Sequence, residues 1–310
     1  VFNSPFANTR SVAELIISNI IALARKVGDQ NKWMHQGQWK KTAVQCYEVR
    51  GKTLGIVGYG HVGSQLSVLS EALGLKVIFY DIIPKLPLGN ARAVSSLDEL
   101  LAQSDFVSLH VPYTKLTNNM IDEEQILKMK KGSYLCNAAR GKCVNIETVA
   151  KYLKNGYLAG AYFDVYPSEP TNETMALCNC PNTILTPHIG GSTQEAQSNI
   201  GLDVASKIVK FINEGATIAC VNFPEVSLEP NAKVHRILNV HRNVPGFLKK
   251  VNNILCEFNV SAQVLKTNPE LGYLLVEIDA NPKFSSDIKQ KFEELEESVR
   301  TRILFAPGAI

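Results

Sequence analysis

The sequence predicts an α/β fold with a doubly wound parallel sheet, followed by a small α+β domain of ferredoxin-like plan. Short apolar runs alternate with helix-like segments from residue 53 to residue 188. This pattern is typical of a parallel sheet covered on both faces. After Pro224 and Pro230 the rhythm changes. The segments that follow have the order βαββαβ, which is the ferredoxin-like plan.

Composition limits the class of protein. The chain has 310 residues, enough for about two domains, and its 45% apolar and 20% charged residues are ordinary for a globular protein. A net charge of +3 argues against nucleic acid or a membrane surface as partner. We find no apolar run of transmembrane length. The chain starts at Val1 with VFNSPF, which resembles a strand end and loop, so we expect it to lack its natural N-terminus.

The seven cysteines are scattered and odd in number, so we expect no disulfide framework. Cys178 and Cys180 form a C-x-C pair without a second pair or a nearby histidine, and we expect no bound metal. Reduced thiols suit a cytoplasmic protein.

The element boundaries follow from apolar periodicity and end signals. Residues 28–50 are polar and irregular, and we expect them to wrap the outside. Thr9 or Ser11 can cap the first helix, and Ser96 with Glu99 predicts a capping box. The predicted strands are 54–58, 76–81, 106–111, 133–139, 158–165, 183–188, 233–241, 260–267, 272–279 and 299–305. The predicted helices are 9–27, 62–73, 96–104, 122–130, 146–155, 193–214, 245–258 and 285–298.

The segment GYGHVG predicts a dinucleotide site because it follows a strand, opens a helix and is trailed by an acid. Gly58 permits the tight turn, Gly60 lets the backbone approach a pyrophosphate, and Gly63 lets the helix pack on the strand. Asp81 lies at the end of the next strand, where its carboxylate can accept hydrogen bonds from ribose hydroxyls. Since the same charge repels a 2′-phosphate, the predicted cofactor is NAD.

Three polar residues come just past the carboxyl ends of predicted strands: Arg140, Glu169 and His188. The planar guanidinium suits a 2-oxo or 2-hydroxy carboxylate. The histidine can take and return a hydroxyl proton, and a neighbouring glutamate favours the imidazolium and orients the ring. Each could alone be structural, but together they predict hydride transfer at a hydroxy acid. His110 is a further candidate for the cofactor cleft, with a structural role equally open.

These stretches together resemble the D-isomer-specific 2-hydroxyacid dehydrogenases, and within them the branch that acts on 3-phosphoglycerate and carries an ACT domain. The resemblance covers nearly the whole chain. It rests most on LPLGNA, NAARGK, GAYFDVYPSEP, LTPHIGGSTQEAQSNIG and VNFPEVSL.

The resemblance implies NAD-dependent oxidation of 3-phospho-D-glycerate to 3-phosphohydroxypyruvate, the entry to serine synthesis. Reduction of 2-oxoglutarate is a further implied activity. The implied catalytic set is Arg140, Glu169 and His188, with His188 as proton donor. The implied cofactor contacts, beside the glycines of the loop, are His61, Val62, Asp81, Ala138, Ala139, Arg140, Asp164, His188, Ile189, Gly190 and Gly191.

The resemblance also implies a division into a Rossmann-type NAD-binding domain (1–191), a remnant of the substrate domain with a linker (192–231), and an ACT domain (232–310). The ACT domain implies a homo-oligomer and a serine effector near His241 and Asn243. Ser261 stands where the family usually has an asparagine, which puts the effector in doubt. The resemblance further implies that this chain lacks most of the substrate domain. In this family about a hundred residues precede the matching region and include the basic residues that hold the substrate phosphate, so we expect those residues to be absent here.

Two alternatives stay open. One is another D-2-hydroxyacid dehydrogenase. The other is a non-catalytic, corepressor-like protein that senses NAD(H) on the same scaffold.

Overall fold

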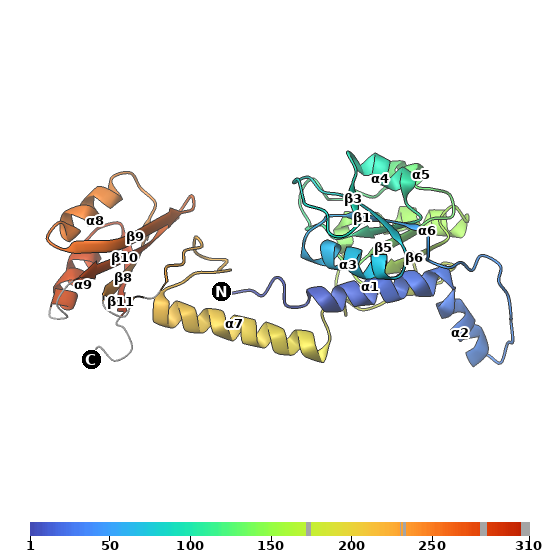
Figure 1. The fold of residues 1–310 in the computed structure, drawn as a ribbon, viewed down its shortest axis with the longest axis horizontal. Coiled ribbons are helices and arrows are strands. Elements are labelled where there is room, and N and C mark those ends of the chain that lie inside the picture. The colour runs from blue at the N-terminus through green and yellow to red at the C-terminus, as the bar shows by residue number, and fades with distance from the viewer. Residues whose placement is uncertain (172–174, 230, 232–233, 280–283, 305–310) are drawn as a thin grey trace. The chain divides into compact units, whose positions relative to one another are not determined.

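The computed structural model describes residues 1–171, 175–229, 231, 234–279 and 284–304, and it divides into two compact units (Figure 1). One unit comprises Phe6–Gln197. The other comprises Val1–Pro5 together with Ser198–Ile310.

The larger unit contains a seven-stranded sheet in which every neighbouring pair is parallel. The strand order is β3-β2-β1-β4-β5-β6-β7, so the chain starts in the middle and winds outward in both directions. The predicted doubly wound sheet is therefore confirmed. The strands are β1 (Thr53–Val57), β2 (Lys76–Tyr80), β3 (Arg92–Ala93), β4 (Phe106–Leu109), β5 (Tyr134–Asn137), β6 (Gly160–Phe163) and β7 (Thr183–Leu185).

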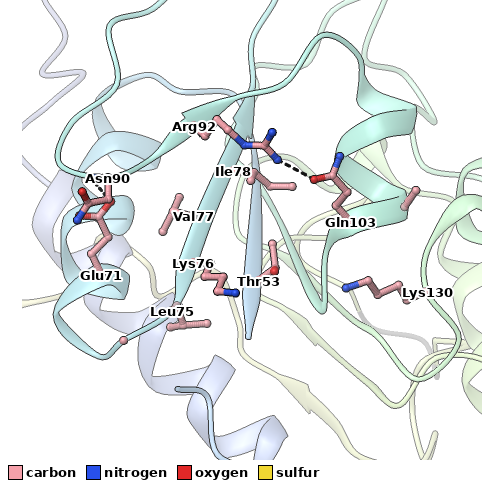
Figure 2. A pocket seen from close by; sticks show the side chains of 12 residues that line it. Thr53, Glu71, Leu75, Lys76, Val77, Ile78, Asn90, Arg92, Gln103 and Lys130 are labelled. Carbon is pink, nitrogen blue, oxygen red and sulfur yellow. Dashed lines mark hydrogen bonds between the residues drawn. The ribbon is translucent and has the colours of Figure 1, made fainter. Parts of the chain in front are cut away.

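A wide hollow of about 750 Å³ lies along the outer edge of β2, at the amino-terminal end of the sheet (Figure 2). β3 pairs with β2 only at Ile78 and Phe79, so the first half of β2 has no neighbour on that side. Arg92 donates a hydrogen bond to Gln103 across the hollow. The functional loops of a parallel sheet lie at the opposite, carboxyl end.

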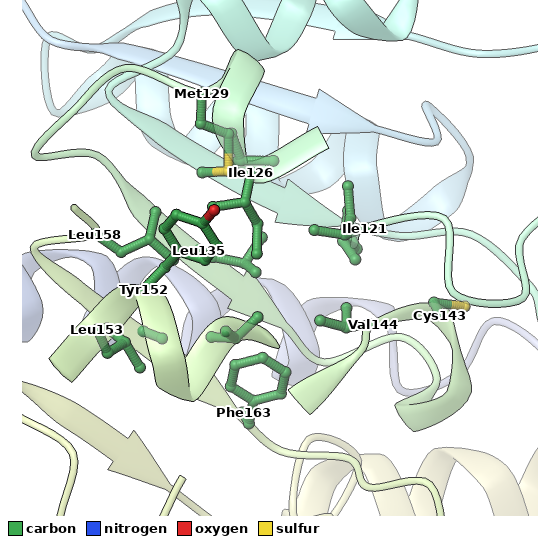
Figure 3. Packing of buried hydrophobic residues seen from close by; sticks show 14 of the residues in the cluster. Ile121, Ile126, Met129, Leu135, Cys143, Val144, Tyr152, Leu153, Leu158 and Phe163 are labelled. Carbon is green, nitrogen blue, oxygen red and sulfur yellow. The ribbon is translucent and has the colours of Figure 1, made fainter. Parts of the chain in front are cut away.

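Helices cover both faces of this sheet. α1 (Thr9–Ala24) and α3 (His61–Ala72) pack on one face. α4 (Leu97–Gln103), α5 (Glu123–Lys128) and α6 (Ile146–Lys154) pack on the other, where Leu135 and Phe163 are fully buried (Figure 3). Burial on both faces explains why the strand sequences are apolar throughout rather than alternating.

Some predicted helix starts differ from the structure. Neither Thr9 nor Ser11 caps α1, which begins after Asn8; the Thr9 hydroxyl instead donates to the Phe6 carbonyl. Ser96 does cap α4 by accepting from the Glu99 N–H, but the Glu99 carboxylate accepts from Ser95. The predicted capping box is therefore only half formed.

The prediction of an irregular segment over 28–50 is wrong in part, because α2 (Val27–His35) is helical. Its described residues are all at least partly exposed. A helix without a buried face has no apolar periodicity, so the pattern that marks the other helices is missing here.

The smaller unit confirms the predicted βαββαβ order. Its antiparallel sheet has the strand order β11-β8-β10-β9. The predicted positions Pro230, Lys233 and Phe305 lie outside the described residues. The elements are β8 (His235–Arg242), α8 (Phe247–Leu255), β9 (Asn259–Thr267), β10 (Leu271–Asp279), α9 (Ser285–Glu293) and β11 (Ser298–Leu304), preceded by the long helix α7 (Gln194–Glu214).

A buried ion pair ties this sheet to the segment before it. Arg236 on β8 pairs with Glu277 on β10, and both side chains are almost wholly buried. The same guanidinium donates to the carbonyls of Glu214, Leu228 and Glu229. Arg236 is thus one of the side chains that hold the end of α7 and the following segment against the sheet, beside Tyr273 and Arg302.

Within the described residues, no helix combines the length and the apolar character that crossing a bilayer requires. The same residues contain no group of three or more His, Cys, Asp or Glu side chains suited to a metal ion.

Replacing Leu135 by alanine should lower the free energy of unfolding of the larger unit by about 2–5 kcal/mol, because the side chain is fully buried between β5 and its helices. Leu127→Ala, on the exposed side of α5, is the matched control and should change it by less than about 0.5 kcal/mol. Urea unfolding followed by circular dichroism measures both. Equal effects of the two changes would contradict the packing.

Candidate active site

The candidate site lies at the carboxyl ends of β5, β6 and β7. β4, β5, β6 and β7 are consecutive neighbours in the sheet. The segments that follow β5, β6 and β7 carry Arg140, Glu169 and His188 in turn. Parallel pairing brings these segments to one edge although they are far apart in sequence.

The glycine loop between β1 and α3 has the geometry that a dinucleotide requires. Gly58 has φ +93°, and a Cβ there would lie 2.6 Å from the His110 carbonyl oxygen. A Cβ on Gly63 would lie 2.2 Å from the Gly58 oxygen, so the helix reaches the loop only without one. A Cβ on Gly60 would meet no described protein atom within 4 Å. Of the three glycines of this loop, only Gly60 has open space where a Cβ would lie, so packing within the described protein does not require a glycine there. This fits a position reserved for a bound pyrophosphate.

Asp81 is held against this loop. Its carboxylate accepts hydrogen bonds from the N–H groups of Tyr59 (2.8 Å) and Ile83 (2.9 Å). Each oxygen retains acceptor capacity for a ribose hydroxyl.

The first turn of α3 contains the predicted contacts His61 and Val62. Within the described chain, Gly60 caps the helix without a side-chain hydrogen bond. The first N–H groups of a helix have no partner within the helix, and the helix dipole favours negative charge there, so this turn suits a bound pyrophosphate. The His61 ring packs on Phe6 with centroids 3.7 Å apart.

Glu169 and His188 form a direct pair. The Glu169 Oε2 atom lies 2.5 Å from His188 Nδ1, and Glu169 Oε1 accepts the Tyr166 N–H at 2.7 Å. With Nδ1 on the carboxylate, the Nε2 atom of the ring is left for a substrate. His188 has φ +55°, a left-handed conformation, and its side chain is about half exposed.

The pKa of Glu169 reflects this environment. Burial acts to raise the pKa of the carboxyl, but hydrogen bonds from Tyr166 and His188 and the charges of His188 and Arg140 lower it on balance. Glu169 is therefore ionised throughout the pH range in which histidine titrates.

The Asp164 carboxylate organises the segment that carries His188. It is 1% exposed and accepts from the Thr186 hydroxyl (2.5 Å) and from the N–H groups of Ile189 and Gly190 (both 2.8 Å). Gly191 follows against the Asn8 side chain. The structure thus gives Asp164 a positioning role toward His188, beside the cofactor contact that we predicted.

The Arg140 segment is braced by the last residue of β5. The Asn137 amide donates to the Arg140 carbonyl, and its oxygen accepts the Ala139 N–H. The Arg140 guanidinium donates to the Ala139 carbonyl at 2.6 Å and is exposed. Ala138 is half-buried at the start of the same turn.

The three predicted catalytic residues share one pocket of about 290 Å³. Its other lining residues were not predicted from the sequence. The full lining is Tyr113, Arg140, Gly141, Lys142, Val165, Tyr166, Pro167, Glu169 and His188.

Gly141 explains why these segments meet. A Cβ there would lie 1.9 Å from the Tyr166 carbonyl carbon, so the Arg140 and Glu169 segments touch backbone to backbone. The glycine next to Arg140 was the available sequence signal for this approach.

Three other predicted residues do not line this pocket. His110 bonds to Ser108, and burial lowers its pKa to about 3, so the ring is neutral and fits a structural role. His241 and Asn243 belong to the smaller unit. The His241 ring is buried, stacks on Phe247 and bonds to Asn239, while the Asn243 amide donates to the Asn268 carbonyl.

Gly60→Ala should leave the melting temperature unchanged but weaken NAD binding by at least about tenfold, because its Cβ meets only the space that the pyrophosphate would need. Gly63→Ala is the matched comparison and should lower the melting temperature, since its Cβ meets backbone. Differential scanning fluorimetry and NADH fluorescence titration measure the two effects. Unchanged affinity in Gly60→Ala would contradict the assignment of the loop.

Comparison with known proteins places the chain in a family. Residues 17–190 match the family model described as D-isomer specific 2-hydroxyacid dehydrogenase, NAD binding domain. A D-3-phosphoglycerate dehydrogenase of Dictyostelium discoideum is 56% identical over 309 residues, which cover 98% of this chain and 75% of that protein. The enzyme of the same name from Escherichia coli is 48% identical over 311 residues, which cover 98% of this chain and 76% of that protein.

Solved structures agree. A D-isomer specific 2-hydroxyacid dehydrogenase of Lactobacillus delbrueckii, in its NAD-complexed form, superposes with a TM-score of 0.66 at 29% identity over 72% of each chain. The chain therefore belongs to the D-isomer specific 2-hydroxyacid dehydrogenases, a family of NAD-dependent oxidoreductases, and its parallel-sheet unit contains the NAD-binding domain.

Proposed function

We propose that this protein oxidises 3-phospho-D-glycerate to 3-phosphohydroxypyruvate with NAD, the first step of serine synthesis. The observation that carries the proposal is the pocket that Arg140 shares with the hydrogen-bonded pair of Glu169 and His188. The choice of substrate is supported by relatives named D-3-phosphoglycerate dehydrogenase, which are 48–56% identical over 98% of the chain.

The proposed mechanism divides the work among three side chains. Arg140 binds the substrate carboxylate with its planar guanidinium and holds C2 beside the histidine. His188 Nε2 takes the proton of the C2 hydroxyl. NAD, which the glycine loop and Asp81 would hold, would supply the acceptor for the hydride of C2.

Glu169 supports the proton transfer. Its carboxylate fixes the Nδ1–H tautomer of His188 and stabilises the imidazolium that forms once Nε2 has taken the proton. Because the pKa of Glu169 lies below its ordinary value, the stabilising charge is present at neutral pH.

We also propose the domain roles. Residues 1–191 form the NAD-binding domain, 192–231 the returning part of the substrate domain with a linker, and 232–310 an ACT domain that binds serine between copies of a homo-oligomer. A cytoplasmic location accords with the free thiols of the described cysteines.

A hydride-transfer assay tests the proposal. The protein should form NADH from NAD and 3-phospho-D-glycerate, with faster turnover than for other D-2-hydroxy acids. Fluorescence titration of NADH serves as the parallel measurement. Tight NADH binding without turnover of any 2-hydroxy acid would favour the corepressor-like alternative and overturn the enzymatic function.

Glu169→Gln should lower kcat and shift the pH profile of oxidation to lower pH by about one unit, because the amide no longer stabilises the imidazolium. Glu147→Gln, an exposed position on α6, is the matched control and should leave the profile in place. Coincident profiles for Glu169→Gln and the unaltered protein would refute the pairing of Glu169 with His188.

Serine should inhibit the reaction in a saturable manner if the smaller unit is a regulatory ACT domain. Asn243→Ala should weaken this inhibition, whereas Asn252→Ala on α8 should not. Titration of L-serine against initial rate measures both. A rate independent of serine would leave the domain without this effector.

A further inference from the structure

Lys142 occupies the rim of the candidate substrate pocket. It follows Gly141 in the short 3-10 helix η1 (Gly141–Cys143) and lines the same pocket as Arg140. The contact of Gly141 with the Tyr166 backbone fixes this helix. The Lys142 carbonyl also accepts the Asn119 N–H at 2.8 Å. Its backbone is therefore anchored on both sides, and only its side chain is free to adjust.

The ammonium group of Lys142 is held near the pocket without being neutralised. Its Nζ atom lies over the Tyr113 ring, 5.7 Å from the centroid, and Tyr113 also lines the pocket. This is the geometry of a cation–π contact, which places a charge but leaves its hydrogen-bond donors available. Among the described residues, no carboxylate forms an ion pair with Lys142.

The charges of the pocket favour a ligand with two anionic groups. Its lining contains two cations, Arg140 and Lys142, and one carboxylate, Glu169, which is engaged with His188. A 2-hydroxy acid that has only its carboxylate would use Arg140 and leave Lys142 without a partner. A second anionic group on C3 gives Lys142 that partner.

We propose that Lys142 is a further contact for the phosphate of the substrate, in addition to the basic residues that the resemblance places before the matching region, and so contributes to the preference for a phosphorylated hydroxy acid. The proposal rests on the function proposed above and specifies a residue for substrate selection. Lysine is a point charge on a flexible stem, which suits a phosphate whose position changes as C2 becomes planar. Tyr113 acts as the support on which the stem rests.

The test compares 3-phosphohydroxypyruvate with hydroxypyruvate, in the direction that consumes NADH. Lys142→Met keeps the length of the side chain and removes the charge. It should lower the ratio of the two kcat/KM values by about tenfold, mainly through KM for the phosphorylated substrate. Lys142→Arg should restore most of the ratio. Raising the salt concentration should reduce the difference between Lys142→Met and the unaltered protein.

Lys115→Met is the matched control, since Lys115 is exposed on the segment that carries Tyr113 but does not line the pocket. It should leave the ratio unchanged. If the unaltered protein prefers the phosphorylated substrate and Lys142→Met keeps that preference, the role of Lys142 is overturned while the proposed function stands. If the unaltered protein reduces neither substrate, the proposed function falls and the role of Lys142 falls with it.

Discussion

The buried carboxylate of Asp164 is the constraint on which the candidate active site depends. A charge removed from water is costly unless it is fully hydrogen-bonded, and Asp164 obtains its donors from the segment after β7. That demand shapes the loop around it and sets His188 at a left-handed backbone angle. The pairing of His188 with Glu169 is then a consequence of where the loop has been placed.

Close contacts between backbone segments, made possible by glycines, position the other parts of the site. Gly63 lets α3 approach the end of β1, Gly58 lets the loop pass the segment after β4, and Gly141 lets the Arg140 segment touch the Glu169 segment. These positions exclude a side chain because protein atoms already fill the space. Gly60 differs, since the space beside it is open. Packing and ligand binding thus place different demands on glycines that look alike in the sequence.

How much could be predicted from the sequence depended on the range of the interaction. The sheet, its helices and the glycine loop follow from periodicity and short spacing, and the structure contains them. The polar helix α2 and the two-residue strand β3 were missed because neither has a buried face to produce a pattern. The pocket rim was missed as well. Tyr113 and Lys142 meet there through contacts between segments distant in sequence, such as the hydrogen bond from the Asn119 N–H to the Lys142 carbonyl, which local patterns do not encode.

The Arg236 side chain links two elements of the smaller unit, the antiparallel sheet and the end of α7. One guanidinium is bonded at once to the sheet through Glu277 and to the last turn of α7 through the Glu214 carbonyl. Separating the end of α7 from the sheet would therefore leave donors of a buried guanidinium without a partner, which costs free energy. The attachment of this end of α7 is thereby coupled to the stability of the sheet through a buried charge pair, beside the hydrogen bonds from Tyr273 and Arg302 to the carbonyls of Gly215 and Ile212.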